Sequence, residues 1–188
     1  MWKAIVCLTL FCGFVYVRSN VDMIGEGRWT VLDVQLCDEP DQYEIVFDCS
    51  RNKLNRTHDG FNAFINLEKE INERDFGILI DIYKKVDGGF KYYQKMSDDS
   101  FCNFSRKYAK ENMEKVLTMA SMDPPDCPIK PGEYKVEGFM FNYDELPEKS
   151  IYGIFKSCAY LIRNMEKISC ICMVLEFKEH DDDDDYED

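Results

Sequence analysis

Nine cysteines are spread along this chain of 188 residues, and the compartment in which the chain folds decides what they can do. Residues 1–19 have the form of a signal peptide. Lys3 gives a positive start, residues 4–17 are apolar, and Val17-Arg18-Ser19 fits a cleavage site. Asn20 is then the predicted first residue of the mature protein. A membrane anchor is the alternative, but the apolar run is shorter than the ~20 residues that an anchor needs.

Export leaves seven cysteines in an oxidising compartment, where a disulfide framework is expected before a metal site. They are Cys37, Cys49, Cys102, Cys127, Cys158, Cys170 and Cys172. Zinc is a weak alternative, because Cys170-Ile171-Cys172 is not a CxxC pair and no second pair or histidine cluster accompanies it. We therefore expect no metal and no cofactor. Because seven is odd, one thiol is free or pairs with another chain.

The charge of the mature chain is strongly acidic. It carries 21 basic and 36 acidic residues, a net charge of −15, and seven of the acids lie in residues 181–188. Without these seven acids the rest of the mature chain has a net charge of −8, which argues against nucleic acid or an anionic membrane as a main partner. The length fits one domain over residues 20–178, followed by a disordered acidic tail at 179–188. Weak calcium binding or docking to a basic partner is the alternative role for the tail, which lacks EF-hand spacing.

Two N-glycosylation motifs, at Asn55 and Asn103, suit an extracellular protein. Asn55 lies in a polar run and is the better candidate, because Asn103 follows Cys102 directly. No later segment is apolar enough to cross a membrane, so we expect a secreted protein that does not span the bilayer.

Catalytic motifs are missing from the sequence. The two histidines, His58 and His180, lie in a polar loop and in the acidic tail. There is no GxSxG, HExxH or glycine-rich phosphate loop. We expect no enzyme, although a glycosidase-like pair of carboxylates from distant positions stays open.

Alternating patterns predict a chain made mainly of strands. The expected strands are 29–36, 43–47, 61–67, 76–86, 90–96, 134–143, 152–163 and 168–177, and 61–67 also has a helical alternative. Asp87-Gly88-Gly89 predicts a hairpin turn, since such turns need positive φ. A second hairpin is expected around Met165. The predicted fold class is all-β, an immunoglobulin-like two-sheet sandwich of about 7–8 antiparallel strands with one inserted helix.

The inserted helix lies between Cys102 and Cys127. Its apolar residues, at helical spacing, are Phe104, Tyr108, Val116, Leu117 and Met119. Pro124 and Pro125 are predicted to stop it. Two interpretations are open: a disulfide-stapled surface helix that completes a core, or a helix that covers a ligand.

Short motifs in the second half of the chain resemble a known family. Cys127-Pro128-Ile129, Gly132-Glu133-Tyr134, Leu146-Pro147, a strand from Gly153, and Ser169-Cys170-Ile171 occur in this order. The order and spacing are similar to ML-type lipid-recognition domains, above all the ganglioside-activator branch and its insect chemosensory relatives. The resemblance covers roughly residues 102–177. Before Cys102 only the strand pattern and an early cysteine match.

The resemblance implies a cup-shaped sandwich whose sheets splay apart to hold a lipid, with the helix near the mouth. It also implies a disulfide between Cys37 and Cys170, and it is consistent with Cys102–Cys127 across the helical loop. Cys158 and Cys172 are equidistant from Met165 and would face each other across the last hairpin. Cys49 is then the unpaired thiol. The extra cysteines that the activators carry around the helix are absent here, so the mouth is expected to be less constrained.

Candidate ligand-lining residues follow from strand alternation and from the helix. They are Ile78, Ile80 and Ile82; Phe139, Phe141 and Tyr143; Phe155, Ala159 and Leu161; and Tyr108 and Leu117 on the helix. Such period-two stripes are more often plain core, and only the resemblance favours a ligand.

Two functions are carried forward. The first is a secreted, non-catalytic carrier of a lipid or other apolar small molecule, as a chemosensory carrier or as a lipid-presenting activator of a hydrolase. The second is a secreted interaction protein with a filled core that acts on a receptor or basic partner. The two differ in whether the sheets leave a cavity between them.

Overall fold

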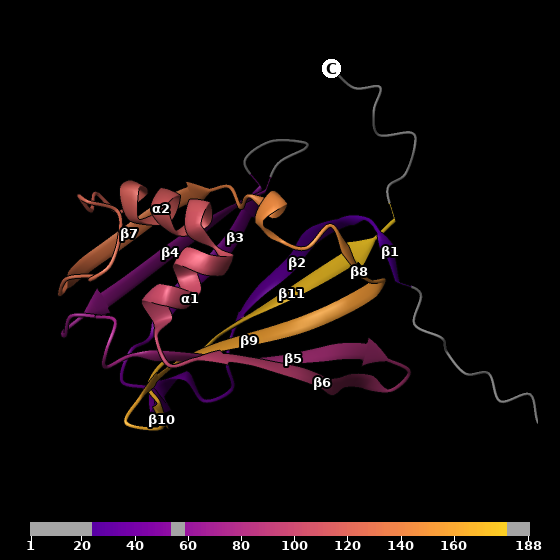
Figure 1. The fold of residues 1–188 in the computed structure, drawn as a ribbon, viewed down its shortest axis with the longest axis horizontal. Helices are drawn as coiled ribbons and strands as arrows, with labels where there is room; N and C mark the ends of the chain where they lie inside the picture. Colours follow the sequence, from indigo (N-terminus) through magenta and orange to yellow (C-terminus); the bar gives the residue numbers. More distant parts are fainter. Residues whose placement is uncertain (1–23, 54–58, 180–188) are drawn as a thin grey trace, which may run out of the picture.

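The computed structural model describes residues 24–53 and 59–179, which form an all-β sandwich with two helices (Figure 1). The predicted leader at 1–19, the glycosylation motif at Asn55 and the tail from residue 180 lie outside the described residues. The predicted fold class is confirmed, because antiparallel sheets dominate and three disulfides connect the elements.

The larger sheet contains six antiparallel strands. In spatial order its main path is β2 (Arg28–Leu36), β11 (Ile171–Lys178), β9 (Gly153–Arg163), β5 (Gly77–Val86) and β6 (Gly89–Asp98), and the short β10 (Glu166–Lys167) pairs with β9. These strands contain most of the period-two patterns that the sequence predicts. Both predicted hairpins form, β5–β6 around Gly88 and β9–β10 around Met165. The last strand begins at Ile171, three residues later than expected, because Ser169 instead bridges to Ile45.

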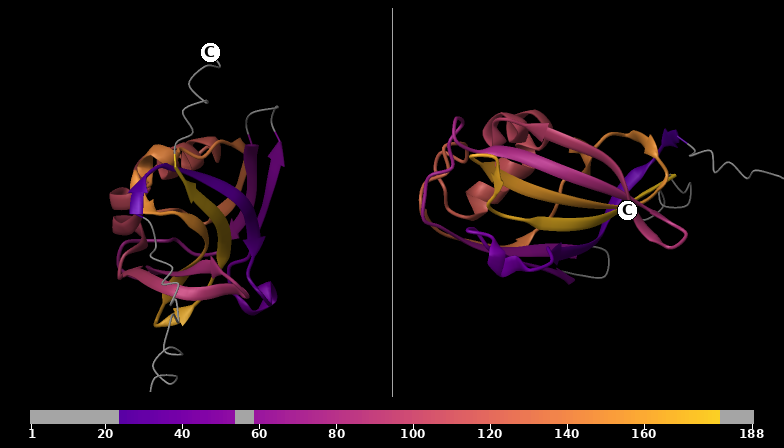
Figure 2. Two further views of the ribbon diagram at one scale, coloured as in Figure 1. Left: turned by 90° about the vertical axis from the view of Figure 1, so that its right-hand side faces the viewer. Right: turned by 90° about the horizontal axis from the view of Figure 1, so that it is seen from below.

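The smaller sheet faces one end of the larger sheet (Figure 1). Its order is β3 (Phe47–Lys53), β4 (Asp59–Leu67) and β7 (Gly132–Phe139), and a separate pair joins β1 (Ile24–Glu26) to β8 (Lys149–Ile151). Along one side of the sandwich β2 contacts β3. On the other side the helices contact the edge strands β7 and β6, so helices close the gap that the sheets leave there (Figure 2).

Two predicted strands differ from the structure. Of the strand expected at 43–47, only Phe47 is in a strand: the chain makes a 3-10 turn, η1 (Pro40–Gln42), and crosses to the smaller sheet, where β3 begins at Phe47. The strand expected at 134–143 ends at Phe139, and Tyr143 starts a second 3-10 turn, η2 (Tyr143–Glu145). Beyond the end of β7 the Asn142 amide donates to the side chain of Asn112 on a helix (2.7 Å) and not to a neighbouring strand.

The single predicted helix is two helices, α1 (Phe101–Tyr108) and α2 (Lys110–Met119). Ala109 separates them with φ −151°, outside the helical region. The Ser100 side chain caps α1 by accepting from the Asn103 amide. α2 ends at Met119, before Pro124 and Pro125, so the two prolines lie in the loop after the helix and do not terminate it.

The three disulfides are Cys37–Cys170, Cys102–Cys127 and Cys158–Cys172, the pairs that the sequence and the resemblance led us to expect. Cys158 and Cys172 are direct partners in the β9–β11 register. Cys49 is unpaired. Burial, and secondly the Asp48 carboxylate, raises the pKa of the Cys49 thiol to about 11, so this thiol stays protonated and unreactive near neutral pH.

Candidate functional site

A cavity of about 210 Å³ lies between the two sheets, with α2 as one wall. The larger sheet contributes Ile78, Ala159, Tyr160, Leu161 and Ile171, and the smaller sheet contributes Phe47, Ala63, Ile65, Leu67, Tyr134 and Val136. Helices and loops add Phe101, Met113, Val116, Leu117, Ala120, Ile71, Ile129 and Ser169. An engineered apolar cavity of roughly 150 Å³ in another protein stays dry and binds benzene, so this space is large enough for a small apolar ligand.

The lining offers almost no free polar group. The Tyr134 hydroxyl donates to the Lys130 carbonyl at 2.7 Å, and the Ser169 hydroxyl accepts the Leu161 amide at 3.3 Å. Tyr160 alternates with Ala159 and Leu161, so its ring lies on the outer face of the sheet, packed against Cys158, Cys170 and Cys172, and its hydroxyl does not face the cavity. No Asp, Glu, His, Lys or Arg of the described residues lines the cavity. Its chemistry is therefore burial of apolar surface, with little capacity to orient a polar group.

Four predicted residues line this cavity: Ile78, Ala159, Leu161 and Leu117. The strand register explains the first three, because Ile78 pairs with Leu161 and Ile80 with Ala159, which places all four side chains on one face of the larger sheet. The inference that this face points inward, away from Cys158, is consistent with the cavity lining.

Seven predicted residues do not line it: Ile80, Ile82, Phe139, Phe141, Tyr143, Phe155 and Tyr108. Ile80, Ile82 and Phe155 share the inward face with Ile78 and Leu161 in the β5–β9 register, but they do not reach the cavity. Alternation identified the face correctly and said nothing about how far the opposing sheet extends.

The remaining three strand aromatics and Tyr108 pack elsewhere. Phe139, Phe141 and Tyr143 form a row with ring centroids 6.2 and 5.2 Å apart, which joins the end of β7 to η2. Tyr108 is 42% exposed and packs against Phe104 on α1. These aromatic contacts fix connecting segments of the sandwich.

Apart from Leu117, the lining residues on α2 and on the smaller sheet were not predicted. On α2 the lining residues Met113, Val116, Leu117 and Ala120 have i, i+3, i+4, i+7 spacing, which a helix starting at Lys110 would have predicted. On β4 the alternating Ala63, Ile65 and Leu67 carry the same kind of signal. Ile71 and Ile129 left no local signal, because only the bridge between their backbones brings them together.

The wall formed by α2 is anchored by polar contacts at its first turn. The Glu145 carboxylate accepts the amides of Glu111 and Asn112 at 2.7 and 2.8 Å. Asn112 also donates its side-chain amide to the Asn142 carbonyl at 2.8 Å. These bonds satisfy amides that a helix start leaves without partners, and they place a negative charge at the positive end of the helix dipole.

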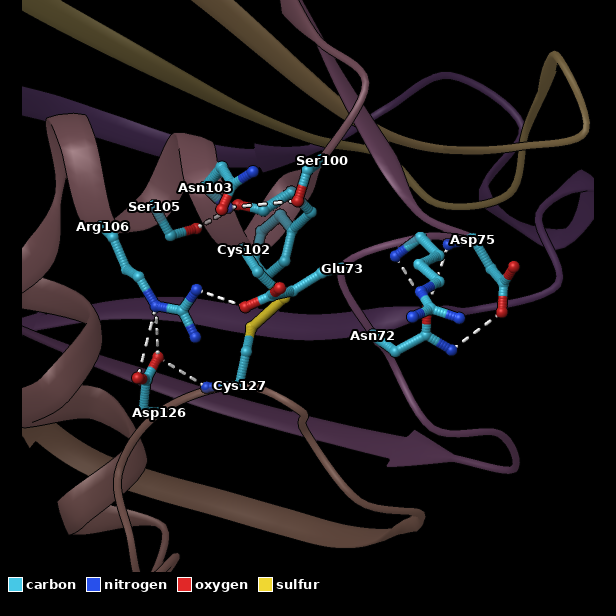
Figure 3. Close-up of a disulfide and its surroundings, with 12 residues drawn as sticks. Asn72, Glu73, Asp75, Ser100, Cys102, Asn103, Ser105, Arg106, Asp126 and Cys127 are labelled. Carbon is cyan, nitrogen blue, oxygen red and sulfur yellow. Dashed lines mark hydrogen bonds and ion pairs between the residues drawn. A yellow bond between two sulfur atoms is a disulfide. The ribbon is translucent and has the colours of Figure 1, made fainter.

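α1 is anchored differently, through the loop that follows α2 (Figure 3). Cys102 and Cys127 form the disulfide, with Cα atoms 6.0 Å apart. One turn along α1, the Arg106 guanidinium donates to Asp126 at 3.0 Å and also to Glu73. The hydrogen bond from Arg106 holds the pKa of Asp126 below its usual range. A covalent and an ionic link thus hold α1 against the same loop.

A cluster of three cysteine sulfur atoms lies on the outer face of the larger sheet, away from the cavity. The Sγ atoms of Cys37, Cys158 and Cys172 are all within 4.8 Å of one another. All three cysteines are disulfide-bonded, so these sulfur atoms are not available as metal ligands.

A scan of the chain against protein-family models finds no match, and no curated protein matches it. Among the described residues no helix has the length and apolar character needed to cross a membrane. The structure thus defines the protein by class, as a disulfide-stapled β-sandwich with an apolar cavity between its sheets.

Proposed function

We propose that this protein is a secreted, non-catalytic carrier that binds a lipid or other apolar small molecule in the cavity between its sheets. The observation that carries the proposal is the cavity itself, about 210 Å³ and lined almost entirely by aliphatic and aromatic side chains. A closed sandwich would pack these faces at interior density. An apolar ligand in this cavity would supply the contacts that the two sheets do not make with each other.

Three further features support the proposal. The N-terminal sequence fits a signal peptide, and the three disulfides suit an oxidising compartment. The motif order from Cys127 to Ile171 resembles ML-type lipid-recognition domains.

The gain in free energy on binding would come from burial alone. Each buried methylene contributes about 0.8 kcal/mol, so affinity should rise with chain length until the cavity is full and then level off. A carrier of this kind would discriminate ligands by length and width and only weakly by headgroup.

The test is displacement of an apolar fluorescent naphthylamine probe by saturated alcohols of increasing chain length, after organic extraction of the purified protein. Val116→Phe fills the cavity from α2, and we expect it to weaken probe binding at least about tenfold. Met119→Phe, on the exposed side of the same helix, is the matched control and should bind as the wild type does. Equal binding by both variants, or no probe binding by the extracted wild type, would contradict the proposal.

A further inference from the structure

The tip of the β5–β6 hairpin exposes an unusual group of apolar side chains. Val86, Phe90, Tyr92 and Tyr93 are 39, 40, 60 and 40% exposed. Gly88 and Gly89 form the turn between them with positive φ and no other atoms near their Cα hydrogens, so the turn projects into open space at one end of the larger sheet (Figure 1). We call residues 83–95 the hairpin tip.

The hairpin tip is basic on a chain that is otherwise acidic. It contains Lys84, Lys85, Lys91 and Lys95 with a single acid, Asp87, a net charge of +3 where the whole chain has −13. Five lysines elsewhere are ion-paired: Lys69, Lys110, Lys135, Lys149 and Lys167. Within 24–53 and 59–179, by contrast, Lys85, Lys91 and Lys95 have no ion pair.

Both faces of the hairpin tip combine aromatic and basic side chains. In the β5–β6 register Lys85 lies opposite Phe90, and Tyr83 lies opposite Tyr92, with the two tyrosine rings 5.9 Å apart. The bulge after Ile82 turns Tyr93 to the other face, where its ring lies 5.9 Å from Phe155. A flat protein partner would cover only one of these faces, whereas a fluid phase can surround both.

From this arrangement we propose that the hairpin tip docks onto a lipid bilayer with anionic headgroups. Tyrosine and phenylalanine favour the boundary between headgroups and acyl chains, and lysines beside them attract anionic lipids. The acidic charge of the whole chain argues against an anionic membrane only at long range. Charges farther than about 8 Å from the contact are largely screened at physiological salt, so the local +3 dominates at the tip.

Other partners fit the hairpin tip less well. β6 is an edge strand, but the lysines along it are the kind of side chain that prevents edge-to-edge pairing with a second copy. A nucleic acid would use the lysines and could stack on tyrosines, yet Val86 and Phe90 beside the turn gain most from an apolar medium.

The test is cosedimentation of the full chain with vesicles of phosphatidylcholine alone or mixed with phosphatidylserine. We expect binding to the mixed vesicles that weakens with added salt. Lys91→Gln with Lys95→Gln should weaken it by about 25-fold, since each lysine near an anionic surface contributes about fivefold. Lys135→Gln with Lys149→Gln makes the same change in charge at two ion-paired lysines and should have little effect.

The apolar contribution has its own pair of variants. Phe90→Ser with Tyr92→Ser should reduce vesicle binding at least about tenfold, whereas Met165→Ser, at a residue 96% exposed on the other hairpin, should not. Thermal unfolding checks that each variant is folded. Equal loss from tip and control variants, no preference for phosphatidylserine, or tighter binding to a DNA duplex than to vesicles would overturn the proposal. Val116→Phe should bind vesicles normally, so this result is separate from the carrier proposal.

Discussion

Removing the disulfide between Cys102 and Cys127 should destabilise the protein by an amount that the structure allows us to estimate. The bond closes a chain segment with a sequence separation of 25, which contains α2 and all of α1 except its first residue. Loop-closure entropy for that length amounts to roughly 3.5 kcal/mol at 25 °C. Against a typical total of about 5–15 kcal/mol, the double variant Cys102→Ala/Cys127→Ala should lose a large part of its free energy of unfolding.

The measurement is guanidinium unfolding followed by tryptophan fluorescence, with the free energy taken from midpoint and slope. At about 2–4 °C per kcal/mol, the melting temperature should also fall by roughly 10 °C. Cys49→Ala is the matched control, because it removes a cysteine that forms no bond. A loss below about 1 kcal/mol in the double variant would refute the reasoning, since it would mean that the ion pairs and packing of α1 hold the loop without the covalent link.

Two other contacts around the helices give smaller effects. Asp126→Asn should lower the free energy of unfolding at pH 7 by at most about 1 kcal/mol, because the ion pair with Arg106 is solvent-exposed. Since Arg106 lowers the pKa of Asp126 in the folded state, this stabilisation is complete above the unfolded pKa of about 4 and is lost as the pH falls through the lower folded value. Variant and wild type should therefore converge in urea titrations below about pH 3, and a constant difference would contradict the assignment. Glu145→Gln should lower the free energy of unfolding by about 1 kcal/mol and speed hydrogen exchange at the first amides of α2, because it removes the charge that caps them. Unchanged exchange at these amides would show that the cap is not needed.

Local sequence patterns were sufficient to predict most strands and one disulfide. Cys158 and Cys172 are paired, as their equal distance from Met165 predicted. The register of the tight hairpin, which pairs Arg163 with Glu166, shifts by one residue between β10 and β11 to bring them opposite each other. The inward face of β5 and β9 also follows from alternation. β3 was missed because its residues are largely polar: an edge strand with exposed side chains has no apolar period to detect.

Features that depend on distant contacts could not be predicted in this way. The break at Ala109 lies next to the first turn of α2, where the Glu145 carboxylate accepts the amide of Glu111, 34 residues away in the sequence. The extent of the cavity depends on where the smaller sheet ends above the larger one. Neither is a property of a single window of sequence, so Ile82 and Ala159 looked equivalent although only Ala159 faces the cavity.

Two disulfides meet at the first residues of β11, where the Cys37 sulfur lies 3.3 Å from the Cys172 sulfur. One links this end of β11 to the segment after β2, and the other links it to β9, so three adjacent strands are covalently connected near one point. We therefore expect β2, β11 and β9 to separate first at their opposite end, where Phe177 pairs with Trp29 and Gly153. Ile171 and Ala159, which are cross-strand partners and line the cavity, lie beside this linked point, so the two disulfides oppose separation of the strands that form this wall of the cavity.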